Sequence, residues 1–253
     1  MHVALFIPCY VDQFYPAVAI ATLELLEKLG CEVVVPRNQT CCGQPMANSG
    51  FASQSAGCDR NMARQFGGFD HIVCPSGSCV LHLREHNAGI QGRVWELSEF
   101  LTDRLQVQHQ PNRFGTLEKP LRVGLHQSCH GQRGLRLASM SERNEPTFSK
   151  VEILLNLING LTVCQPTRPD ECCGFGGTFC VTQETLSVKM GKDRLAEHLA
   201  NKVDAILGGD MSCLMHLEGI LRRQVSPVRV LHLAQLLNEA CPLPLHQPNT
   251  IPA

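Results

Sequence analysis

Cysteine is the residue type in this sequence that is best able to carry chemistry. The chain has 14 cysteines among 253 residues, which is more than an ordinary intracellular enzyme contains. Two adjacent pairs stand out, Cys41-Cys42 and Cys172-Cys173, and a glycine follows each of them. A disulfide within such a pair is strained, because neighbouring Cα atoms are about 3.8 Å apart and disulfides usually need at least about 4.4 Å. The pairs therefore favour metal ligation.

The cysteine motifs belong to an internal repeat. Val3 to Tyr10 (VALFIPCY) matches Val123 to His130 (VGLHQSCH), and Asp70 to Cys79 matches Asp204 to Cys213. The offset between the copies grows from 120 to 136 residues along the chain, but the order of the landmarks is kept, so the sequence consists of two related halves. The repeat defines eight candidate metal ligands, four in each half: Cys9, Cys41, Cys42 and Cys79, then Cys129, Cys172, Cys173 and Cys213.

Each half alternates predicted strands and helices, for example a strand at 3–8, a helix at 17–29 and a strand at 31–35. This alternation predicts an α/β fold with two pseudo-symmetric domains, each a small parallel sheet with crossover helices. We place the boundaries of these parts from the repeat and from the polar and proline-rich stretches. They are a first domain at 1–106, a linker at 107–120, a second domain at 121–240 and a disordered tail at 241–253.

All eight candidate ligands follow predicted strands. In an open parallel sheet, ligands bind in the loops beyond the carboxyl ends of the strands, so four thiols are expected to converge in each half. Thiolates in fours suit either zinc or an iron-sulfur cluster. Structural zinc sites generally take two ligands from one tight turn, whereas these thiols come from three separate loops. We therefore expect an iron-sulfur cluster of the 4Fe-4S type, with zinc as the alternative.

Charge and hydropathy exclude several other classes of protein. Lys plus Arg number 22 and Asp plus Glu number 23, so there is no electrostatic footprint for nucleic acid. No stretch approaches the ~20 apolar residues of a transmembrane segment, and the N-terminus lacks the cationic region of a signal peptide. These features predict a cytoplasmic protein, in which clustered cysteines serve as metal ligands or redox centres. Peripheral attachment at the inner membrane through partners is compatible with them.

The doubled motif resembles the cysteine-rich CCG domain of heterodisulfide reductase and of the iron-sulfur subunits of glycolate oxidase and anaerobic glycerol-3-phosphate dehydrogenase. With TCCGQPMANSG at Thr40 and ECCGFGGTF at Glu171, the chain is most similar to the lactate-utilization protein A family. That resemblance implies an oxidoreductase subunit of a three-part L-lactate dehydrogenase (oxidase) complex, which oxidises lactate to pyruvate and transfers the electrons. It also implies two partner subunits, one of them ferredoxin-like, a small hydroxy-acid substrate, and no activity of this chain alone.

The chain departs from the family pattern once in each half. The full pattern ends each motif in C-x-x-C, which makes five thiols, but Ser76 and Asp210 stand at the first position of that pair. An ordinary 4Fe-4S cluster is therefore expected rather than the noncubane cluster of heterodisulfide reductase. Asp210 is a candidate oxygen ligand or a helix N-cap before Met211. Cys74 is a substitute thiol only if its loop bends, and its counterpart Gly208 argues against that role.

His126 is the second candidate catalytic residue beside Asp210. With His130 it brackets Cys129, so its imidazole could contact a cluster sulfur, carry a proton or bind substrate, or it is an ordinary loop histidine. Cys180 has no repeated partner, and no role is assigned to it. Two functions remain as alternatives to lactate oxidation: a zinc-stabilised assembly subunit without redox chemistry, and a thiol/disulfide oxidoreductase resembling heterodisulfide reductase.

Overall fold

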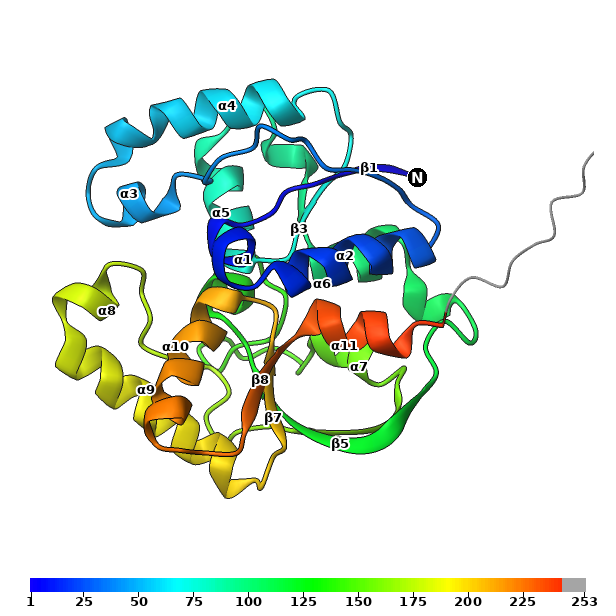
Figure 1. The fold of residues 1–253 in the computed structure, drawn as a ribbon, viewed down its shortest axis with the longest axis vertical. Helices are drawn as coiled ribbons and strands as arrows, with labels where there is room; N and C mark the ends of the chain where they lie inside the picture. Colours follow the sequence, from blue (N-terminus) through cyan, green and yellow to red (C-terminus); the bar gives the residue numbers. More distant parts are fainter. Residues whose placement is uncertain (243–253) are drawn as a thin grey trace, which may run out of the picture.

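Two four-stranded parallel sheets, one from each half of the sequence, form the frame of the computed structural model, which describes residues 1–242 (Figure 1). The strands of the first sheet lie in the order β2 (Glu32–Val34), β1 (His2–Leu5), β3 (Ile72–Cys74) and β4 (Val94–Glu96). Those of the second lie in the order β6 (Asn159–Cys164), β5 (Thr116–His126), β7 (Ala205–Gly208) and β8 (Arg229–His232). The two strand orders are equivalent, which confirms the predicted α/β fold with two similar parallel-sheet units.

Helices connect the strands of each half. Those of the first half are α1 (Cys9–Phe14), α2 (Pro16–Lys28), α3 (Gln44–Asn48), α4 (Ala56–Phe66), α5 (Gly77–His86) and α6 (Leu97–Glu99). Those of the second half are α7 (Lys150–Leu155), α8 (Phe179–Thr182), α9 (Glu184–Ala200), α10 (Met211–Arg223) and α11 (Leu233–Ala240). Among residues 1–242, no helix is both long enough and apolar enough to cross a membrane.

The strand registers show that the halves are structural copies. Ala4 of β1 pairs with Ile72 of β3, and their sequence counterparts Gly124 and Ile206 pair in the same way between β5 and β7. The central strands are apolar and buried, as expected for parallel sheets that are covered by helices. The repeat seen in the sequence is therefore a repeat of tertiary structure.

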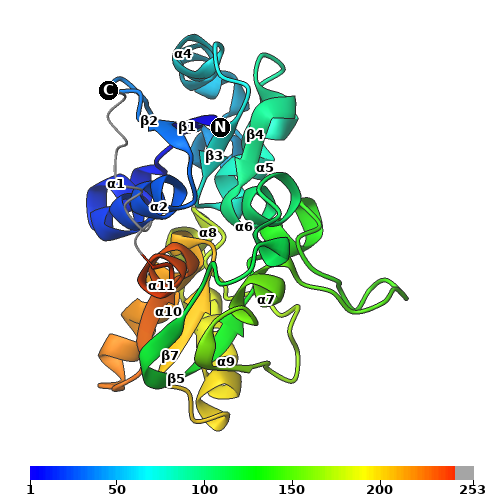
Figure 2. The same ribbon diagram turned by 90° about the vertical axis from the view of Figure 1, so that its right-hand side faces the viewer.

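The two halves pack closely against each other. In both views α2 of the first half lies beside α11 of the second (Figures 1 and 2), and Lys28 Nζ donates a hydrogen bond to the carbonyl of Asn238 over 2.8 Å. One buried apolar cluster includes Leu25 and Leu26 of α2 together with Leu236 and other residues of α11. Since the halves share this core, their division at 1–106 and 121–240 as domains stays a prediction.

The segment predicted as a linker, residues 107–120, is part of the packed structure. Strand β5 begins inside it, at Thr116. Val107, Phe114 and Leu117 are buried in the core that both halves share, because these apolar side chains gain more from burial than from exposure in a free linker. Of the predicted tail, Cys241 is buried, and residues 243–253 lie outside the described part of the chain.

Candidate metal centre

Three loops at the carboxyl edge of each sheet carry the predicted thiols. Cys9 begins α1 after β1, the Cys41-Cys42 pair follows β2, and Cys79 lies in the first turn of α5 after β3. The second half repeats this arrangement with Cys129, Cys172, Cys173 and Cys213 after β5, β6 and β7. Because the carboxyl ends of parallel strands meet at one edge of a sheet, the loops bring each set of four thiols together.

In the first half the thiols form two close contacts. The Cys9 thiol lies 3.8 Å from Cys41 Sγ, and the Cys42 thiol lies 3.5 Å from Cys79 Sγ. Hydrogen bonds from the thiols of Cys42 and Cys9 lower the pKa of Cys41 far below its usual value, whereas hydrogen bonds with Cys41 and Cys79, together with burial, raise the pKa of Cys42. The protonation states of these neighbouring thiols therefore depend on one another.

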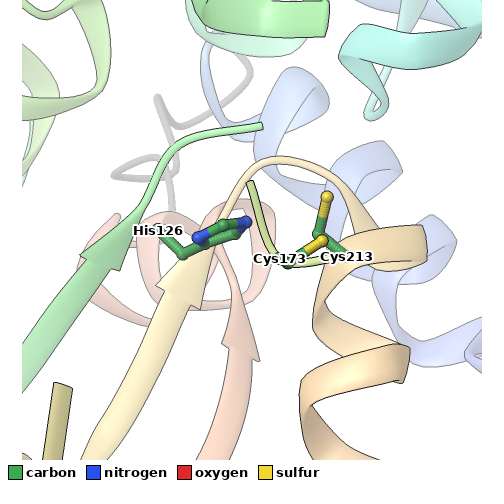
Figure 3. A group of neighbouring side chains, drawn as sticks. All are labelled: His126, Cys173 and Cys213. Atoms are coloured by element: carbon green, nitrogen blue, oxygen red, sulfur yellow. The ribbon is translucent and has the colours of Figure 1, made fainter. Parts of the chain in front are cut away.

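The second half has the same pattern with one addition. The thiols of Cys129 and Cys173 lower the pKa of Cys172, and the thiols of Cys172 and Cys213, together with burial, raise the pKa of Cys173. The thiols of Cys173 and Cys213 and a ring nitrogen of His126 all lie within 4.8 Å of one another. Figure 3 shows the imidazole at the end of β5 with one edge turned toward the two thiols.

A glycine with a left-handed backbone shapes each cysteine pair. Gly43 has φ of 95° and Gly174 has φ of 89°, values that L side chains rarely adopt. A Cβ at Gly174 would lie 2.6 Å from the Ser187 carbonyl oxygen, so only glycine fits. The amides of these glycines point back at the pair: Gly43 N lies 3.5 Å from Cys41 Sγ and Gly174 N lies 3.3 Å from Cys172 Sγ. Each amide stabilises the thiolate of the first cysteine.

Both sets of thiols border one cavity between the halves. Its lining includes every predicted ligand except Cys41, which borders a neighbouring cavity together with Cys9. Across this junction the ring of Tyr10 meets that of Phe175 edge-on, with 5.8 Å between their centroids. The carboxyl edges of the two sheets therefore face each other, and a molecule in the cavity has access to thiols of both halves.

Asp210 is a helix N-cap, as one of the two sequence interpretations predicted. Its Oδ1 accepts hydrogen bonds from the amide and the hydroxyl of Ser212 at 3.2 and 2.7 Å. Its Oδ2 accepts one from the amide of Ser78 in the first half, at 2.9 Å. The side chain is 2% exposed and still borders the cavity. Both oxygens are thus engaged within the protein, and their role as metal ligands stays a prediction.

His126 is buried and lacks polar partners. The residue is 2% exposed, and neither ring nitrogen has a hydrogen-bond partner among residues 1–242. Burial, followed by the positive charge of Arg194, lowers the pKa of His126 well below its usual value. The neutral imidazole therefore has a free lone pair, and its role at this site stays a prediction.

Comparisons with known proteins agree with the paired thiol sites. The family model described as "CCG: Cysteine-rich domain" matches residues 3–84 and 123–218, which are the two halves that carry the cysteine motifs. Curated relatives include Lactate utilization protein A of Exiguobacterium sp., 36% identical over 94% of this chain and 97% of the relative. The same protein of Geobacillus sp. is 36% identical over 94% of this chain and 99% of the relative.

The chain belongs to the lactate utilization protein A family of CCG cysteine-rich domain proteins. The resemblance predicted from the sequence is thereby confirmed. Among solved structures the chain is similar to a "putative Asp/Glu Racemase from Yersinia pestis", with 12% identity, a TM-score of 0.38, and coverage of 95% of this chain and 97% of that chain.

Cys74 is closer to the thiols of the first half than the comparison with its counterpart Gly208 suggested. Cys74 is buried at the end of β3 in one cluster with Cys42 and Cys79, and its thiol contacts the Ser76 carbonyl at 3.9 Å. The first half of this CCG protein thus holds five neighbouring thiols. The signal available in the sequence was the position of Cys74 at the end of a predicted strand, just before the loop that carries Cys79. Cys180 is not among the residues that line the shared cavity, and its thiol contacts the carbonyl of Gly177 at 3.0 Å.

The cysteine thiols of each site suit a metal ion or cluster that prefers soft thiolate ligands. Each half of this CCG protein offers thiols from three loops, partly shielded from water, with an amide aimed at one of them. That chemistry suits iron-sulfur clusters and zinc. The sulfur pairs at 3.5 and 3.8 Å are close enough for two thiolates on one ion, since tetrahedral Zn–S bonds of ≈ 2.3 Å place sulfurs about 3.8 Å apart. A four-iron cluster needs the thiols to spread, because each binds its own iron.

Proposed function

We propose that this chain is the iron-sulfur subunit of a multi-subunit complex that oxidises L-lactate to pyruvate and transfers the electrons. The observation that carries the proposal is the meeting of two thiol sets at one cavity. The name of the relatives, Lactate utilization protein A, supports lactate as the substrate. The eight thiols Cys9, Cys41, Cys42, Cys79, Cys129, Cys172, Cys173 and Cys213 would hold the clusters.

The residues of the chain have separable tasks in this proposal. An iron-sulfur cluster, when bound, supplies one-electron transfer. The amides of Gly43 and Gly174 stabilise thiolate charge. Asp210 and His126, both buried beside the thiols, remain the candidates for contact with substrate or metal. Oxidation of lactate removes two electrons and two protons, so this arrangement needs further electron carriers.

Those carriers would belong to other subunits. We propose two partner subunits, one of them ferredoxin-like. We also propose that the chain is inactive by itself, because iron-sulfur centres carry electrons singly and must pass them on to an acceptor. The complex would lie in the cytoplasm, and any attachment to the inner membrane would be through the partners. A zinc-stabilised, non-redox role is the second candidate, favoured by sulfur pairs at 3.5 and 3.8 Å that suit a single ion.

Metal analysis and activity test the two candidates together. The complex, purified without oxygen through a tag on this chain, should contain iron and acid-labile sulfide and should reduce a dye with lactate. Cys173→Ser should abolish this activity, and Cys180→Ser, outside the thiol sets, should leave it unchanged. Zinc without iron and sulfide would favour the structural role. Full activity of Cys173→Ser, or turnover of a heterodisulfide instead of lactate, would overturn the assignment.

A further inference from the structure

The two thiol sites differ in the residues at the ends of their central strands. In the second half, His126 of β5 pairs with Gly208 of β7. Register places Phe6 and Cys74 at the equivalent positions of the first half, one residue beyond the pair Leu5 and Val73, and Phe6 N donates to the Val73 carbonyl at 2.9 Å. Each half therefore has one side chain with a donor atom at this level. It is Cys74 on β3 in the first half and His126 on β5 in the second, so the two donors stand on non-equivalent strands.

Each of these two side chains reaches the thiols of its own half. Cys74 packs with Cys42 and Cys79 in one buried cluster, and His126 lies within 4.8 Å of Cys173 and Cys213. Gly208 has no side chain and Phe6 has no donor atom, so neither site has both groups. Each site therefore has four repeated thiols and a fifth donor, which is sulfur in the first half and nitrogen in the second.

The surroundings of the fifth donor change with it. Phe6 meets Phe66 of α4 edge-on with ring centroids 5.7 Å apart, and His126 meets His198 of α9 in the same way at 6.2 Å. Four residues before these partners stand Met62 in the first half and Arg194 in the second, all of them buried. The buried side chains in this place are thus two phenyl rings and a methionine in the first half, and two imidazoles and a guanidinium in the second.

Burying the polar side chains around His126 costs free energy unless they interact with a charged group. Arg194 is completely buried, and its Nε and Nη2 have no hydrogen-bond partner within the described residues. Its Nη1 donates to the Arg168 carbonyl and lies 3.9 Å from Glu197. The charges of Glu197 and Glu171 already act on this cation, but burying its two unpaired donors is costly, and thiolates bound to a metal group would add further negative charge.

We propose that a ring nitrogen of His126 is a ligand of the metal group in the second half, so that the two centres of this protein differ in donor chemistry. The inference rests on the proposed iron-sulfur function. A neutral imidazole in place of a thiolate raises the reduction potential of an iron-sulfur centre, and the nearby Arg194 cation acts in the same direction. Electrons in this chain would therefore move from the centre of the first half to that of the second.

Nitrogen couplings in pulsed electron paramagnetic resonance test this ligand directly. The full chain, labelled with ¹⁵N-histidine, is reconstituted with iron and sulfide without oxygen and then reduced. Cys42→Ser in every sample removes the first centre, so the signal reports the second. The compared variants are His126→Phe, which installs the ring found at Phe6, and His130→Gln, which removes a neighbouring imidazole that borders the same cavity.

We expect a ¹⁵N coupling typical of a bound imidazole that is lost in His126→Phe, is retained in His130→Gln, and is accompanied by a lower reduction potential in His126→Phe. If the phenylalanine variant does not fold, His126→Asn, with a smaller side chain, takes its place. A coupling unchanged in the His126 variant, or too weak for a direct bond, overturns this inference and leaves the iron-sulfur function standing. Failure of the wild-type chain to retain iron and sulfide overturns both.

Discussion

The carboxylate of Asp210 accepts a hydrogen bond from the amide of Ser78, 2.9 Å away, and joins the N-terminus of α10 to that of α5. Ser76 caps α5 from the position equivalent to Asp210, and its hydroxyl lies 3.4 Å from the same carboxylate oxygen. Ser76 and Asp210, each three residues before the last repeated cysteine of its half, are therefore in contact with each other. They connect the halves at the point where their two sites meet.

Replacing Asp210 should destabilise the protein more than replacing Ser76. Asp210→Ala leaves the buried amide of Ser78 and the half-buried amide of Ser212 without their acceptor, and we expect a loss of about 3 kcal/mol in the free energy of unfolding. Ser76→Ala removes a capping contact with the Cys79 amide at 3.4 Å and hydroxyl contacts with Ser78 and Asp210 at 3.1 and 3.4 Å, and it should cost about 1 kcal/mol. Denaturant unfolding of the metal-free proteins measures both values. Equal losses would show that the connection between the halves contributes little.

Glycine at position 174 should be required for steric reasons beyond its backbone angle. Gly174→Ala places a Cβ 2.6 Å from the Ser187 carbonyl oxygen, and we expect a loss of more than about 2 kcal/mol. Gly30→Ala is the matched control, because Gly30 has a similar φ of 86° and no atom within 4 Å of the added Cβ. It should lose about 1 kcal/mol from backbone strain alone. Similar losses in the two variants would contradict the clash.

Glu96 should make the stability depend on pH. Burial raises its pKa from 4.5 to about 7, so the folded protein holds this proton more tightly than the unfolded chain. The stability associated with the protonated group is complete below pH 4.5 and is lost as the pH rises through 7. Relative to Glu96→Gln, the wild-type protein should therefore lose on the order of 2 kcal/mol between about pH 5 and about pH 8. Urea unfolding at both pH values checks this, and a constant difference between the two proteins would refute it.

Loss of one ligand cysteine should empty only the site in its own half. Cys42→Ser and Cys173→Ser should each reduce the iron and sulfide content to about half, because each set of thiols comes from its own half, and the double variant should retain almost none. Iron and sulfide are measured per chain after anaerobic reconstitution, with Cys180→Ser as the control. Complete loss in either single variant would indicate one cluster shared across the cavity.

Local patterns in the sequence were sufficient to predict the two-fold repeat, the alternation of strands and helices, and the eight thiols at strand ends. The patterns that carried these predictions are apolar runs, a glycine after each cysteine pair, and the equal order of landmarks in both halves. The linker at 107–120 stays a prediction, and the burial of Phe114 and Leu117 within it depends on residues distant in the sequence.

The differences between the two sites depend on tertiary structure. Cys74 and His126 reach their thiols because neighbouring strands pair in a particular register, and Arg194 is buried beneath one site because α9 packs there. The contact of Asp210 with the first half joins residues 132 positions apart. Such contacts depend on the packing of the two halves, and no local pattern in the sequence encodes which polar side chain will meet which partner.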